Sequence, residues 1–114
     1  MERRVAQLLM RRLDVFRNAD RASAKHIPFL LIVQSELLDD IPTRVVVPMV
    51  VPHALGGPPA KMLNPEFEIE GQNVVMLTQQ LAGVAVQRLK VRVANLDDRR
   101  HDIVRALDFL FSGI

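Results

Sequence analysis

The sequence predicts an α+β fold, mainly β, in which a small antiparallel barrel is followed by one C-terminal α-helix. Short alternating or β-branched segments recur between turns rich in Gly, Pro and Asn over residues 13–93, which is the pattern of β-strands. Residues 103–111 instead repeat apolar side chains with a helical period. Consecutive strands joined by short loops cannot form parallel crossovers, so we expect the sheet to be antiparallel.

The first three strands are predicted over residues 13–17, 28–34 and 44–51. The first alternates apolar and polar side chains, the second is mostly apolar, and the third is the most β-branched stretch of the chain. Pro48 lies inside the third segment. Because proline has no N–H for the hydrogen-bond ladder, we expect it at an edge strand or a bulge.

A hairpin and one or two further strands complete the predicted barrel. Gly and Pro exclude regular structure over residues 51–59. Residues 66–70 alternate strictly, residues 71–73 are predicted to turn the chain, and residues 74–78 return it. Residues 81–93 supply the last one or two strands, so we expect five to seven in total.

The predicted helix has a wider apolar face than one core requires. Asp97 is the expected N-cap, with Asp98 favourable in the first turn. The apolar side chains fill an arc of roughly 160°, whereas packing on one core needs only about 100°. They are Ile103, Val104, Ala106, Leu107, Leu110 and Phe111. With no polar tail after this helix, we expect it to contact both its own domain and a partner.

Size and composition exclude several classes of protein. A chain of 114 residues with 49% hydrophobic and 25% charged residues forms one domain and is not intrinsically disordered. It contains no cysteine, which excludes a disulfide framework and thiolate chemistry. No run approaches the roughly 18 apolar residues of a membrane-spanning helix, and the first residues lack a signal-peptide pattern. We therefore expect a cytoplasmic protein without membrane contact.

The positive charge is concentrated at the N-terminus. The first twelve residues hold four arginines and one glutamate, which gives this segment a net charge of +3. Since the whole chain has a net charge of +2, residues 13–114 carry −1. Direct nucleic-acid binding normally needs a basic folded surface, which this balance disfavours. We expect residues 1–12 to be a disordered extension and residues 13–114 to form the single domain.

Four segments resemble the CcdB family of toxins, in the same order and with similar spacing. They are VQSELLD at 33–39, Arg44 with Val47-Pro48, MLTQQLAGV at 76–84, and residues 103–114, which end in Gly-Ile. The likeness extends from about Leu13 to the last residue, whereas residues 1–9 have no counterpart.

The resemblance implies a homodimer of SH3-like barrels, a fold shared with the MazF and Kid toxins. It also implies the toxin of a type II toxin–antitoxin system, which binds the A subunit of DNA gyrase and traps the complex with cleaved DNA. Such a protein inhibits by binding and is not an enzyme, so no catalytic residue, metal or cofactor is expected. A CcdA-like antitoxin would neutralise it and repress the operon together with it. DNA would be contacted only indirectly, through gyrase or the toxin–antitoxin complex.

The family's gyrase-binding positions carry over to this chain. They are Leu37, Leu38, Asp108, Phe111, Ser112, Gly113 and Ile114. The best-known members have Trp where this chain has Ser112, Asn at Asp108 and Glu at Arg100. Loss of the Trp removes a cation–π contact of about 0.5–2 kcal/mol, or roughly 2- to 30-fold in affinity. We therefore expect weaker binding, or binding to a different gyrase.

Two other functions are compatible with the sequence. The first is an mRNA endoribonuclease of the MazF or Kid type, because fold does not fix function. It would need His26 or His53 with Arg44 and Asp39 as base, acid and cation. The second is an inactivated toxin-like binding module, which the Ser112 departure suggests. The three histidines have no metal-ligand spacing, so no metal site is predicted.

Overall fold

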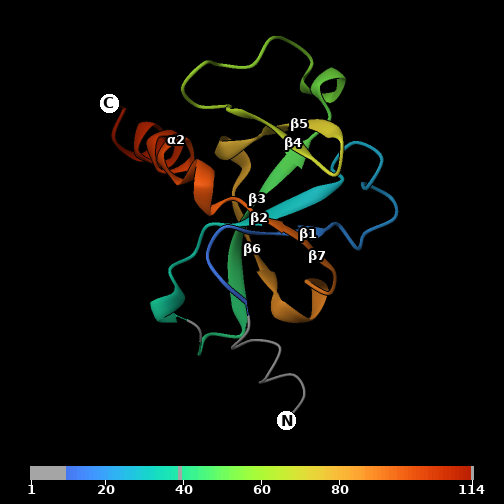
Figure 1. Ribbon diagram of the computed structural model, residues 1–114, viewed down its shortest axis with the longest axis vertical. Helices are drawn as coiled ribbons and strands as arrows, with labels where there is room; N and C mark the ends of the chain where they lie inside the picture. The colour runs from blue at the N-terminus through green and yellow to red at the C-terminus, as the bar shows by residue number, and fades with distance from the viewer. Residues whose placement is uncertain (1–9, 39, 114) are drawn as a thin grey trace.

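The computed structural model describes residues 10–38 and 40–113 and confirms an α+β fold, mainly β. An antiparallel sheet curls into a half-barrel, and one C-terminal helix lies beside it (Figure 1). The strands are β1 Asp14–Arg17, β2 Phe29–Ile32, β3 Thr43–Val50, β4 Glu66–Ile69, β5 Gln72–Met76, β6 Ala82–Ala85 and β7 Arg92–Asn95, and the helix is α2 Arg100–Ser112.

Five short 3-10 helices occur in the connections between these elements in the described part of the chain. They are η1 Glu36–Leu38, η2 Pro52–Leu55, η3 Thr78–Gln80, η4 Val86–Arg88 and η5 Asp97–Arg99. No helix among the described residues is long and apolar enough to cross a membrane.

The central strand of the sheet is β3. The strand order is β4-β5-β3-β2-β1-β7, and β6 also pairs with β3. Along one side, β3 pairs with β2. Along the other side, it pairs first with β6 over residues 43–46 and then with β5 at Met49 and Val50. This change of partner lets a sheet of short strands curl around its core.

Pro48 lies in this central strand, so the expectation of an edge or bulged position is wrong. Its Cα partner in β2 is Leu30, and its carbonyl accepts a hydrogen bond from the N–H of Leu77 over 2.9 Å. The N and C=O of one strand residue point to the same side. The missing N–H of Pro48 therefore faces the junction where β5 ends at Met76 and β6 begins at Ala82, and no ladder bond is lost there.

The β4–β5 hairpin turns one residue earlier than predicted. Glu70 and Gly71 occupy the turn with φ of 53° and 75°, and Gln72 already pairs with Ile69. Two consecutive residues with positive φ in a two-residue loop are typical of a type I′ turn. Gly71 adopts this conformation at little cost, whereas Glu70 is strained there.

Apolar residues on both faces of β1, β2 and β3 form two separate cores, because successive side chains of a strand point to opposite faces. The larger core includes Leu13, Val15, Leu31, Val47, Met49, Phe67, Ile69, Val74, Met76, Ile103 and Ala106. The smaller core consists of Met10, Phe16, Ile32, Val46, Val86 and Leu89. The helix contributes to the larger core only.

Met10 is buried in the smaller core, and the side chain of Arg12 donates to the carbonyl of Val33 over 3.3 Å. The last residues of the predicted N-terminal extension thus contact the barrel. Residues 1–9, where most of that extension lies, are outside the described residues. The division of the chain after residue 12 stays a prediction.

Candidate functional site

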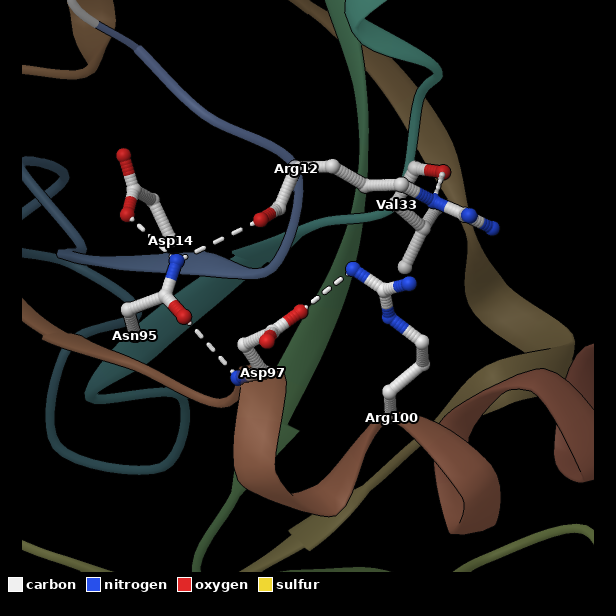
Figure 2. Close-up of polar contacts among 6 residues, drawn as sticks. All are labelled: Arg12, Asp14, Val33, Asn95, Asp97 and Arg100. Atoms are coloured by element: carbon white, nitrogen blue, oxygen red, sulfur yellow. Dashed lines mark hydrogen bonds and ion pairs between the residues drawn. The ribbon is translucent and has the colours of Figure 1, made fainter.

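The site that the sequence predicts lies mainly at the end of α2, and the position of α2 is fixed by its start. The side-chain oxygen of Asn95 accepts a hydrogen bond from the N–H of Asp97 over 2.9 Å (Figure 2). Asp97 itself pairs with Arg100. The prediction of Asp97 as N-cap is therefore wrong: Asp97 is the first residue of η5, which continues as α2, and its N–H donates to the side chain of Asn95 at the end of β7.

The start of the helix is tied to β1 through a buried carboxylate. The side-chain amide of Asn95 donates to Asp14 over 2.9 Å and to the carbonyl of Arg12 over 3.3 Å (Figure 2). Asp14 is 1% exposed. Its other oxygen accepts from the N–H of Arg11 over 2.8 Å and lies 3.5 Å from the guanidinium of Arg92. Since every partner is on β1, β7 or the adjoining turns, this network fixes where α2 leaves the sheet.

One face of α2 is packed on the barrel. Ile103 and Ala106 are fully buried in the larger core, and Leu107 packs against it. The guanidinium of Arg99 lies 4.3 Å from the ring centroid of Phe67 and forms a 2.9 Å ion pair with Asp102. These contacts fix the rotation of the helix about its axis, and therefore which side chains its last turn presents to solvent.

The last turn of α2 presents an aromatic side chain to solvent. Phe111 is 73% exposed, and Asp108 and Ser112 are exposed beside it. Gly113 ends the helix with φ of 72°, and its N–H donates to the carbonyl of Phe109 over 2.9 Å. The apolar arc is thus covered on the Ile103 side and uncovered at Phe111.

A second apolar surface lies on η1 and the residues that follow it. Leu37, Leu38 and Ile41 are 94%, 47% and 42% exposed. The loop is braced from within, because the Gln34 side chain donates to the carbonyl of Leu38 over 3.3 Å and accepts from the N–H of Val45 over 3.1 Å. Both leucines of the predicted site therefore point away from the core.

Within a single chain, the predicted site residues form two groups that lie apart from each other. Asp108, Phe111, Ser112 and Gly113 share the end of α2, whereas η1, with Leu37 and Leu38, is drawn well away from it (Figure 1). Ile114 lies outside the described residues. The surface is therefore split into a helix-end patch (Asp108, Phe111, Ser112, Gly113) and a loop patch (Leu37, Leu38, Ile41).

The residues considered for ribonuclease chemistry do not come together. The rings of His26 and His53 lie 6.2 Å apart, centroid to centroid, and the carbonyl of His26 accepts from the N–H of Val51, just after β3 ends. Arg44 lies near the other end of that strand, and six residues of β-strand span about 20 Å. Asp39 is not among the described residues.

Arg44 has a structural role. It is 2% exposed, and its guanidinium donates to the carbonyls of Ile41 and Thr43 over 2.6 and 2.8 Å. A buried cation that binds backbone carbonyls of its own loop stabilises that loop. Within the part of the chain that the structure describes, no cluster of three or more metal-ligating side chains occurs.

Sequence reasoning missed Ile41, Gln34 and Asn95 at this site. Asn95 has a recognisable signal, because an Asn two residues before a helical segment often accepts from the backbone N–H two residues on. Ile41 follows two acidic residues and precedes Pro42 in a short irregular segment. No periodicity indicates its exposure there.

A family model described as CcdB protein matches residues 12–113 of this chain. The match includes both the loop patch and the helix-end patch.

Proposed function

This chain belongs to the CcdB family, a family of toxins from toxin–antitoxin systems, and we propose that it acts by binding the A subunit of DNA gyrase. In this proposal it traps gyrase while the DNA is cleaved and carries out no chemistry of its own. Residues 13–114 form the toxin domain, and residues 1–12 are an extension of it.

The exposure of Phe111 is the observation that best supports this proposal. An isolated exposed apolar residue is common, but Phe111 sits on a helix whose rotation and C-cap are fixed. Because the helix that carries the ring is already ordered, binding a partner costs only the rotamer freedom of the side chain itself. Burying it against a partner contributes about 1.5–3 kcal/mol. We propose that Asp108, Ser112, Gly113 and Ile114 surround this anchor in the gyrase complex.

We further propose that two chains form a homodimer with twofold symmetry. The loop patch and the helix-end patch are separate in one chain (Figure 1), and a second copy can supply the missing neighbour. A twofold axis would also place two Phe111 side chains in equivalent positions, which suits a symmetric target such as the gyrase dimer. Leu37 and Leu38 then belong to the same gyrase-binding surface.

The ribonuclease function is less well supported, because its candidate residues lie at opposite ends of β3. The proposed partner in the cell is a CcdA-like antitoxin that neutralises the toxin and represses the operon with it. DNA is then contacted through gyrase or through the toxin–antitoxin complex. We propose the cytoplasm as the site of action, because gyrase and DNA are present there.

A plasmid-cleavage assay tests the proposal. The untagged protein is incubated with gyrase, ATP and supercoiled plasmid, and the reaction is then treated with detergent and protease. We expect linear DNA from the wild type, much less from Phe111→Ala, and wild-type amounts from Arg105→Ala, which changes an exposed residue of the same helix.

The alternatives predict different results in this assay. Absence of linear DNA with a folded wild-type protein would overturn gyrase poisoning. RNA cleavage by that same sample would then favour the ribonuclease. If neither nucleic acid is cleaved, the inactivated binding module becomes the better description.

A further inference from the structure

A pocket of about 390 Å³ lies where β2 begins and β3 ends. Its polar side chains are those of His26, just before β2, His53 in η2 and Gln80 in η3. None of them belongs to the helix-end patch or the loop patch, so the pocket is a separate surface. The remaining lining is apolar and consists of Ile27, Val50, Ala54 and Leu77.

The two histidine rings lie next to each other in this pocket. Their centroids are 6.2 Å apart, and the ring planes meet edge to face at 81°. Both residues are exposed. Neither imidazole forms a hydrogen bond or an ion pair with a residue in the described ranges 10–38 and 40–113. No described side chain therefore competes with a ligand for their ring nitrogens.

Backbone hydrogen bonds hold the two histidines at this spacing. The carbonyl of His26 accepts from the N–H of Val51 over 2.9 Å, and the N–H of His26 donates to the carbonyl of Ser23 over 3.0 Å. The segment with His53 begins directly after Val51, whose carbonyl accepts from the N–H of Ala54 over 3.0 Å. The two backbones are thus fixed relative to each other, whereas the exposed rings can still rotate.

The spacing of the rings suits two ligands of one metal ion. A bond between zinc and an imidazole nitrogen is about 2.0–2.1 Å, so two imidazoles on one tetrahedral ion have ring centroids roughly 5 Å apart. Rotation of the exposed side chains can remove the difference of about 1 Å between rotamers of similar energy. Imidazole nitrogen is a preferred ligand of Zn²⁺, Cu²⁺ and Ni²⁺, whereas Mg²⁺ prefers oxygen.

We propose that His26 and His53 together bind one divalent transition-metal ion such as Zn²⁺, with water in its remaining positions. Gln80 lines the same pocket, and its amide oxygen can accept a hydrogen bond from such a water. The apolar lining limits the access of bulk water to the ion. Because no third histidine or carboxylate joins the pair among the described residues, the ion is exchangeable rather than permanently bound.

A bound ion would join two segments that are far apart in the sequence. The histidines have no ligand spacing along the chain, and only the fold brings two of them together. Since the unfolded chain lacks the paired site, the ion should stabilise the folded form and raise Tm. This inference is independent of the gyrase proposal, because neither apolar patch contributes to the pocket.

Isothermal titration calorimetry of the untagged chain with ZnCl₂ tests the proposal, and thermal unfolding with and without ZnCl₂ measures the effect on Tm. We expect one ion per chain and a rise in Tm that EDTA reverses, with no binding of Mg²⁺. Absence of Zn²⁺ binding at millimolar concentration would overturn the proposal. Equal binding of Mg²⁺ would also overturn it, because an oxygen site would then be responsible.

The third histidine of the chain supplies a matched control. His26→Asn and His53→Asn each remove one ligand and should weaken Zn²⁺ binding by about tenfold or more, because the second imidazole acts at a high effective concentration. His101→Asn makes the same substitution at an exposed residue of α2 outside the pocket and should leave the Kd unchanged.

Thermal unfolding without metal checks that each variant is folded. Both pocket histidines are exposed, so we expect the Tm of the metal-free variants to stay close to that of the wild type. Wild-type affinity for Zn²⁺ in either folded pocket variant would overturn the assignment of the ligands. Equal weakening in His101→Asn would overturn it as well.

Discussion

The side-chain amide of Asn95 donates to the buried carboxylate of Asp14 over 2.9 Å and so joins β7 to β1. The oxygen of the same amide accepts from the N–H of Asp97. A single side chain therefore links the sheet to the first turn of the helical segment. The direction in which α2 leaves the barrel, and with it the position of Phe111, depends on this link.

Replacing Asn95 should destabilise the protein. Asn95→Ala leaves one oxygen of Asp14 without its hydrogen bond in a buried position, and we expect the free energy of unfolding to fall by about 1–3 kcal/mol. Urea denaturation followed by circular dichroism measures the change. Asn73→Ala, at an exposed position of β5, is the control and should have little effect. Equal losses in both variants would contradict the linking role of Asn95.

Substitution of Ile103 should lower the stability of the protein, whereas substitution of Phe111 should lower gyrase binding. Ile103→Ala creates a cavity in the larger core and should cost about 2–5 kcal/mol. Phe111→Ala removes an exposed ring and should change the free energy of unfolding by at most about 0.5 kcal/mol, while reducing gyrase binding measured by surface plasmon resonance. A large loss of stability in Phe111→Ala would show that the ring packs on the barrel.

Ser112→Trp should strengthen gyrase binding. In the proposed gyrase complex, the family resemblance implies that a tryptophan at this position stacks on an arginine of gyrase, a contact worth about 0.5–2 kcal/mol, which corresponds to roughly 2- to 30-fold in Kd. Titration of the immobilised A subunit of gyrase with both proteins measures the ratio. Ser112→Leu adds apolar area without an aromatic ring and is the control. An equal gain from leucine would argue against the cation–π explanation.

Glu70→Asn should stabilise the protein slightly. Glu70 has φ of 53° in the type I′ turn, and Asn-Gly is a preferred pair there. The substitution also removes the ion pair with Arg17, whose side chains are 53% and 40% exposed, and such exposed pairs contribute only about 0.2–1 kcal/mol. We expect a net gain of about 0.5 kcal/mol, because relief of the left-handed conformation is worth about 1–2 kcal/mol. Thermal unfolding should then show a higher Tm, and a lower Tm would mean that the ion pair dominates.

Gly113→Val should loosen the last turn of α2 without unfolding the barrel. Gly113 has φ of 72°, and a Cβ there would meet no atom within 4 Å. The cost is therefore conformational, and it is greater for valine than for asparagine, which tolerates this region. Hydrogen exchange should show loss of protection at the amide of residue 113 in Gly113→Val and partial retention in Gly113→Asn. Equal protection in both variants would exclude a capping role.

The local pattern of the sequence predicts most strands, because turn residues separate them clearly. The segments 13–17 and 44–51 correspond to β1 and β3 to within one residue at each end. The position of Pro48 could not be predicted, since it depends on where β3 exchanges β6 for β5, and those strands are distant in the sequence. The start of the helical segment was missed because Asp97 and Asn95 are both good capping residues.

The candidate site was only partly predictable. The apolar arc of α2 indicates more apolar surface than one core can cover, but it does not indicate which edge stays open. Because Ile103 and Ala106 pack on the larger core, the edge of the arc at Phe111 is the one that stays exposed.

The pairing of β1 with β7 has a consequence for synthesis on the ribosome. β1 is made early but must wait for one of its two neighbours until nearly the whole sequence has been translated. Pairing between such distant segments is slow compared with local folding, and α2 follows β7 in the sequence. A partly made chain thus lacks both the β1–β7 pairing and the exposed Phe111. The surface that we propose to bind gyrase can form only after translation has passed the last turn of α2.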